Sequence, residues 1–106
     1  MDSKDIEWHE SHGYRVTDAT EWLGLTPEEE ELIVKTRVAL TLLLKRRREA
    51  VGMTQAELGA RIGTSQSRVA FMEANRKNVS SDLLLRAIAA TGATAADVGA
   101  AILNAA

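Results

Sequence analysis

Apolar positions recur at helical spacing in five stretches of the chain, and each stretch is bounded by residues that begin or end helices. The longest is expected over about residues 27–50, because Thr26 with Glu29 forms a capping box and Pro27 occupies the first helical position. Four shorter helices are expected over 55–62, 65–74, 81–91 and 95–103, after the capping residues Thr54, Ser65, Ser80 or Ser81, and Thr94.

The remaining chain lies at the N-terminus and lacks this periodicity. Residues 1–17 mix charged and polar side chains, and 18–24 form at most a short helical turn that Gly24 ends. Strand signal is limited to a weak stretch at 13–16. We therefore expect an all-α protein of five helices, with residues 1–25 as an N-terminal arm and 26–106 as one domain.

Composition agrees with this fold class and narrows the function. Aliphatic residues and alanine dominate the 106 residues, with one proline and four aromatic side chains. The absence of cysteine excludes disulfides, the polar N-terminus does not resemble a signal peptide, and no apolar run has membrane-spanning length. These features predict a cytoplasmic protein.

The sequence contains little that indicates an enzyme. No serine–histidine–acid set, phosphate-binding glycine loop or paired carboxylates can be identified, so we expect no enzyme activity and no cofactor. His9 and His12, with Glu7 and Glu10, have helical spacing but lack a further convincing ligand. We predict a solvated arm there and no metal site.

Charge is distributed unevenly although the net charge is only −2. Residues 1–31 contain ten acidic and two basic side chains, whereas 45–77 contain eight basic and three acidic ones. Lys45, Arg46 and Arg47 are compatible with a solvated helix end or with phosphate binding. A local basic excess that the rest of the chain masks is typical of a nucleic-acid-binding surface.

The basic segment also contains two short helices that are spaced to pack together. Leu58 and Ile62 share one face of the first helix, and Val69 and Met72 share one face of the second. Gly63 supplies a turn conformation that a side chain would resist. This pattern predicts a helix-turn-helix, in which Gly59 allows the second helix to approach closely and to project from the surface.

The stretches TQAELGARIG, TSQSRVAFME and DLLLRAIAATG resemble the lambda-repressor-like, or XRE, family of helix-turn-helix regulators over about residues 40–103. The resemblance implies a five-helix domain that binds double-stranded DNA as a homodimer. It also implies that the helix over 65–74 enters the major groove and that Gln55 contacts a phosphate. The implied DNA-binding residues are Gln55, Ser65, Gln66, Ser67, Arg68, Phe71, Arg76, Lys77 and Asn78.

Two features of this implied site concern its structure and its specificity. Arg48 and Glu73 match a buried ion pair that joins the first helix to the recognition helix in this family. Phe71 takes an outward position where relatives place a polar base-reading residue. Its aromatic ring could contact thymine methyl groups or be partly buried in the domain.

The sequence leaves two functions open, and the two are compatible. The first is a sequence-specific regulator, expected to be a repressor, which binds a palindromic operator as a dimer. The two protomers are expected to associate through the C-terminal helix, with Val98, Ile102 and Leu103. The second is a HigA-type antitoxin that also represses its own operon. For that alternative, the acidic arm with Trp8, Tyr14 and Trp22 would bind a basic toxin.

Overall fold

The computed structural model describes residues 24–75 and 79–105, and the described chain is helical with no strand. The expected arm and its short turn lie outside the described residues, apart from Gly24 and Leu25. Five helices follow one another as expected: α3 Pro27–Ala50, α4 Gln55–Ile62, α5 Gln66–Glu73, α6 Ser81–Ala90 and α7 Ala95–Ala105.

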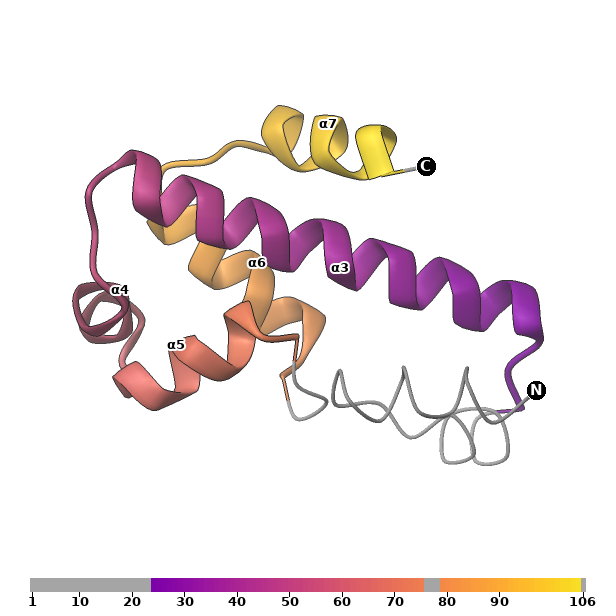
Figure 1. The fold of residues 1–106 in the computed structure, drawn as a ribbon, viewed down its shortest axis with the longest axis horizontal. Coiled ribbons are helices and arrows are strands. Elements are labelled where there is room, and N and C mark those ends of the chain that lie inside the picture. The colour runs from indigo at the N-terminus through magenta and orange to yellow at the C-terminus, as the bar shows by residue number, and fades with distance from the viewer. Residues whose placement is uncertain (1–23, 76–78, 106) are drawn as a thin grey trace.

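Helix α3 forms the axis of the domain, as Figure 1 shows. Helices α4, α5 and α6 lie on one side of α3, and α7 packs on the other side. Both α6 and α7 have extensive contact with α3, while α4 packs mainly against α5. Helix α5 is therefore separated from α7 by the long helix.

The core forms where α3, α4, α5 and α6 meet. The side chains with less than 2% exposure include Leu44 of α3, Leu58 of α4 and Leu84 of α6. Helix α5 contributes Val69 and Met72, both at 0% exposure. Burying side chains of this size stabilises the fold by about 1.5–3 kcal/mol each, so the predicted contact between the two short helices forms the centre of the core.

Local sequence signals determine where these helices begin. The Thr54 hydroxyl accepts the Glu57 amide at 3.0 Å and the Glu57 carboxylate accepts the Thr54 amide at 3.2 Å, which completes a capping box. Thr26 and Ser65 cap α3 and α5 in the extended conformation. Ser80 rather than Ser81 caps α6, and α7 extends two residues beyond the expected Leu103.

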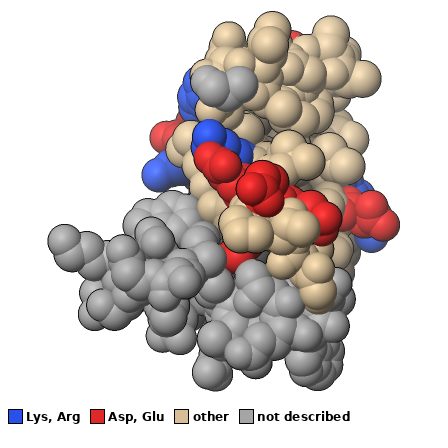
Figure 2. All heavy atoms as spheres, turned by 90° about the vertical axis from the view of Figure 1, so that its right-hand side faces the viewer, with Lys and Arg blue, Asp and Glu red and all other residues tan. Residues whose placement is uncertain are grey.

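The acidic start of α3 does not point entirely into solvent. Figure 2 shows acidic side chains gathered at this end, below an almost uncharged region formed by α7. Glu30, however, is only 5% exposed. Val34, one helical turn later, and Arg37, two turns later, are also buried. The run 28–31 thus combines favourable charges at a helix N-terminus with one buried carboxylate, which the periodicity did not indicate.

Candidate nucleic-acid interface

The turn between α4 and α5 is tight because two glycines make it possible. Gly63 has a φ of 74°, in the left-handed region, and ends α4. A Cβ atom on Gly59 would lie 2.8 Å from the carbonyl oxygen of Thr64. Gly63 therefore adopts the predicted turn conformation, and Gly59 allows the predicted close approach. The group that comes close to Gly59 is the backbone of the turn rather than α5 itself.

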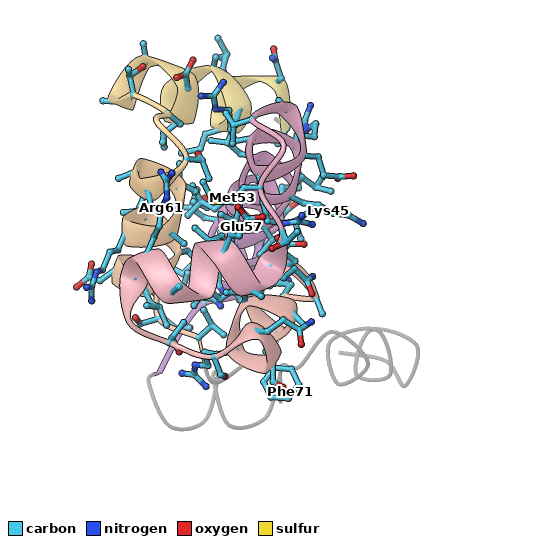
Figure 3. All side chains as sticks on the ribbon, turned by 90° about the vertical axis from the view of Figure 1, so that its left-hand side faces the viewer. Lys45, Met53, Glu57, Arg61 and Phe71 are labelled. Atoms are coloured by element: carbon cyan, nitrogen blue, oxygen red, sulfur yellow. The ribbon has the colours of Figure 1, made fainter. Side chains whose placement is uncertain are left out.

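Helix α5 has a buried face and an exposed face. Val69 and Met72 enter the core, whereas Gln66, Ser67 and Phe71 are exposed. Phe71 is 47% exposed, and its ring points outward from α5 in Figure 3. The helix therefore presents its N-terminal turn and one side to the surroundings, which is the arrangement that base contact requires.

An ion pair between Arg48 and Glu73 fixes the other end of α5 to α3. Arg48 Nε donates to Glu73 Oε2 at 2.5 Å and Nη2 donates to Oε1 at 2.9 Å, a bidentate geometry. The side chains are 13% and 5% exposed, and Arg48 Nη1 also donates to the Met53 carbonyl at 2.8 Å. The hydrogen bond to Glu73 raises the pKa of Arg48 although burial opposes it.

The same carboxylate orients two glutamines at the start of α4 and α5. Gln55 Nε2 donates to Glu73 Oε1 at 3.1 Å, and Gln66 Nε2 donates to Gln55 Oε1 at 2.8 Å. A carboxylate can only accept, so it fixes which way the Gln55 amide faces, and this in turn fixes the Gln66 amide. Gln66 then retains its oxygen and one N–H for a ligand.

Two arginines of the basic segment bond to α6. Arg47 Nη2 donates to the Thr91 carbonyl at 3.1 Å, and Arg61 Nη1 lies 3.4 Å from the Ala90 carbonyl. These carbonyls stand at the C-terminal end of α6, where a helix lacks internal partners and favours positive charge. Arg47 is therefore bonded to the end of α6 rather than fully solvated, and phosphate binding by Arg47 stays a prediction.

Two further cations of the segment remain at the surface of the part that the structure describes. Lys45 and Arg46 are exposed on α3, and Lys45 points away from the helices in Figure 3. Arg68 is half-buried at the first turn of α5. The predicted backbone-contacting loop with Arg76, Lys77 and Asn78 lies outside the described residues, so its position relative to α5 stays a prediction.

Comparison with known families decides which class of protein this is. The sequence model of the helix-turn-helix family matches residues 44–98, just over half of the chain. The chain belongs to the helix-turn-helix family. Its XRE-type, lambda-repressor-like character follows from the same match, and the protein is a DNA-binding transcription regulator. No curated protein and no solved structure matches the chain.

Within this helix-turn-helix protein, the match begins inside α3 and ends inside α7. The first 17 residues of α3, 27–43, therefore lie outside the matched segment although they continue the same helix. Across 24–75 and 79–105, no group of three residues is arranged to hold a metal ion, and no helix there has the length and apolar character needed to cross a membrane.

The residues predicted for dimerisation do not share one environment. Val98 is half-buried and packs against the core of its own chain, whereas Ile102 and Leu103 are 38% and 75% exposed. None of the eleven residues of α7 is fully buried. Ile102 and Leu103 are thus available for association, and Val98 mainly attaches α7 to the domain.

Sequence reasoning missed the contacts that join these parts. Gln55 was expected to hold a phosphate, but its amide also connects Glu73 to Gln66. The partner of Arg47 lies 44 residues away in the chain. Helical spacing shows which face a side chain occupies, but it cannot show which distant carbonyl that face meets.

Proposed function

We propose that the protein represses transcription by binding a palindromic operator as a homodimer, with α5 of each protomer in the major groove. The observation that supports this most directly is the hydrogen-bonded chain from Glu73 through Gln55 to Gln66. A Gln side chain pairs with adenine by donating to N7 and accepting from N6, and Gln66 retains one N–H and its oxygen for this purpose. Its orientation is fixed before DNA arrives, which lowers the entropy lost on binding.

Backbone contacts would supply most of the affinity. Gln55 lies at the N-terminus of α4, where amide groups and the helix dipole favour a phosphate. Ser65, Ser67 and Arg68 stand around the first turn of α5, within reach of the sugar-phosphate backbone or base edges. A protein bound in this way represses by occupying a promoter that overlaps its operator.

Dimerisation through Ile102 and Leu103 is compatible with this mode of binding. Helix α7 lies across α3 from α5, so association through α7 leaves the recognition helix uncovered (Figure 1). Two half-sites on one face of DNA are separated by about 34 Å, one helical turn. Leu103→Asp would place a charge in the proposed interface, and we expect sedimentation equilibrium to show monomers for this variant and dimers for the wild type.

Selection of bound sequences from random DNA tests the operator proposal. We expect an inverted repeat with an adenine that loses its preference in Gln66→Ala. Lys35→Ala is a suitable control because Lys35 is exposed on α3 and pairs only with Glu31 among the contacts described. Selection of no sequence, or an unchanged preference in Gln66→Ala, would contradict the proposal.

The toxin-binding alternative rests on the arm, which lies outside the described residues. It stays a prediction from the acidic composition of residues 1–25. A basic partner protein that co-purifies with the full chain and is lost on deletion of 1–24 would support it. A partner complex that survives the deletion would remove this role from the arm.

A further inference from the structure

One face of α3 is removed from solvent over most of the length of the helix. The residues on it recur three and four positions apart, which is the spacing of a single helix face. They are Glu30, Val34, Arg37, Thr41, Leu44 and Arg48, and the first four are 4–8% exposed. We call this face the α3 stripe, and its burial shows that it faces protein along its length.

The C-terminal part of the α3 stripe is covered by helices that the structure describes. Leu44 lies in the core, and Arg48 pairs with Glu73 of α5. The N-terminal part differs, because Val34 is only 7% exposed but does not belong to the core cluster. Figure 1 shows that the first turns of α3 extend beyond α5, α6 and α7. The burial of Glu30 and Val34 therefore points to a segment other than these helices.

The chain that precedes α3 has the length needed to reach this part of the stripe. Outside the described residues there are also 76–78 and 106, which are too few to cover several helical turns. Residues 1–23 end directly before Gly24, whose φ of 63° lies in the left-handed region and lets the chain change direction. Even as a single helix, 23 residues would span about 35 Å, whereas the eleven-residue step from Glu30 to Thr41 spans about 17 Å.

This N-terminal segment also contains side chains that suit such a surface. Trp8, Tyr14 and Trp22 are three of the four aromatic residues of the chain, and aromatic rings bury large apolar areas against a residue such as Val34. The segment also contains six acidic and two basic residues. A buried guanidinium such as that of Arg37 is stable beside groups that accept its hydrogen bonds, and carboxylates are the strongest acceptors.

We propose that residues 1–23 fold back and dock on the N-terminal half of the α3 stripe, with aromatic rings against Val34 and a carboxylate beside Arg37. The docked segment covers the part of α3, 27–43, that lies outside the family match. This interaction goes beyond operator binding and requires no contact with DNA. A basic protein that bound the same aromatic side chains would compete with α3, so its binding would be coupled to exposure of the stripe.

Tryptophan fluorescence tests the docking in the full chain, because Trp8 and Trp22 are its only tryptophans. We expect acrylamide to quench them less in the native protein than in urea. In Val34→Asp the equilibrium between docked and released segment should shift about tenfold towards release, because the buried valine contact is lost and a charge takes its place. Far-UV circular dichroism establishes whether this variant keeps its helices.

Leu32→Asp is the matched control for the charge. Leu32 lies two residues from Val34 on another face of α3 and is 66% exposed, so quenching in this variant should equal that of the wild type.

A second measurement leaves the stripe intact. The chain has no cysteine, so a spin label can be attached at Leu32→Cys alone, and it should broaden the backbone amide signals of residues 1–23. The same label at Ala60→Cys is the control, because Ala60 is exposed on α4, at the other end of the domain (Figure 1). We expect no broadening of these signals from that position.

Several results would overturn the inference. Equal quenching in the native protein and in urea would show that the segment is not docked, and unchanged quenching in a folded Val34→Asp would place it elsewhere. Protection that is lost on dilution would assign the cover to a second copy of the chain. If Val34→Asp does not fold, the spin labels decide, because the absence of broadening from Leu32→Cys contradicts docking. None of these results bears on operator selection, so the inference and the proposed function fail separately.

Discussion

Helices α5 and α7 both lie at the surface and both contact α3, but they are held in different ways. Helix α5 has only eight residues, yet it contributes two completely buried side chains and ends at an ion pair with α3. Helix α7 has eleven residues, none of them fully buried. A helix that presents particular atoms to a ligand needs a fixed orientation, whereas α7 keeps apolar side chains that remain available for another surface.

Loss of Glu73 should give the largest effect, because it removes the contact that distinguishes α5. In Glu73→Ala the Arg48 guanidinium remains mostly buried without its counter-ion, and we expect the free energy of unfolding to fall by about 3–5 kcal/mol. Urea denaturation measures this change. Glu31→Ala is the matched control, because its pair with Lys35 is 58% and 63% exposed and should contribute about 0–0.5 kcal/mol. A loss below 1 kcal/mol in Glu73→Ala would show that α5 is held by apolar packing alone.

Adding one methyl group to each of two helical glycines sharpens the comparison. In Gly59→Ala the new Cβ would lie 2.8 Å from the Thr64 carbonyl oxygen and 3.1 Å from that of Ser65, which predicts a loss of about 1–3 kcal/mol. In Gly99→Ala of α7 nothing lies within 4 Å, so the helix should gain about 0.5–1 kcal/mol. Thermal unfolding of both variants should therefore shift in opposite directions. Equal shifts would mean that the turn before α5 is no tighter than the surroundings of α7.

Asn75 lies just beyond α5, and a substitution at this position should make the protein more stable than the wild type. Its φ is 56°, its exposure is 4%, and neither polar atom of its amide has a hydrogen-bond partner among the described residues. Asn75→Gly removes both the strain and the buried amide, and we expect a gain of about 1 kcal/mol. Asn75→Ala keeps the strain and should be about 1 kcal/mol less stable than Asn75→Gly. If Asn75→Gly unfolds more easily than the wild type, the amide has a structural role.

The smallest effect concerns pH and the start of α7. Hydrogen bonds from the Thr94 amide and hydroxyl lower the pKa of Asp97 below its usual 3.8. The folded state therefore binds this proton less readily than the unfolded chain, so the cap stabilises α7 fully above pH 3.8 and is lost as pH falls through the lower folded pKa. In Asp97→Asn, the backbone amides of α7 should be less protected from hydrogen exchange at neutral pH. Their protection should also fall less than in the wild type when the pH is lowered, and hydrogen exchange measures both effects. Unchanged acid dependence would assign the effect to other carboxylates.

Local signals explain why the helices could be predicted from the sequence. Thr26 with Pro27, Thr54 with Glu57, and Gly63 each act on residues within one turn, so their consequences do not depend on the rest of the fold. The register of the family resemblance adds the Arg48–Glu73 contact, which the structure contains. Fold class and helix order were therefore accessible without coordinates.

The missing parts depend on distances that the sequence does not encode locally. Periodicity placed Gln66 on the surface of α5, but only the packing of α4 against α5 brings Gln55 close enough to orient it. Similarly, the direction of Arg47 follows from helical spacing, whereas its bond to Thr91 requires the position of α6. The burial of Glu30 shows the same limit, since a run of four glutamates gives no sign of which one turns inward.

The bonds of Arg47 and Arg48 within the protein affect how ionic strength should govern operator binding. Each phosphate that a cation neutralises releases condensed counterions, and the logarithm of the affinity falls by about 0.9 per phosphate for each tenfold rise in salt. Of the eight positive side chains between residues 45 and 77, Arg47, Arg48 and Arg61 already bond to a carboxylate or a helix end. A salt titration should therefore yield a slope that is shallower than the cation count of this segment suggests.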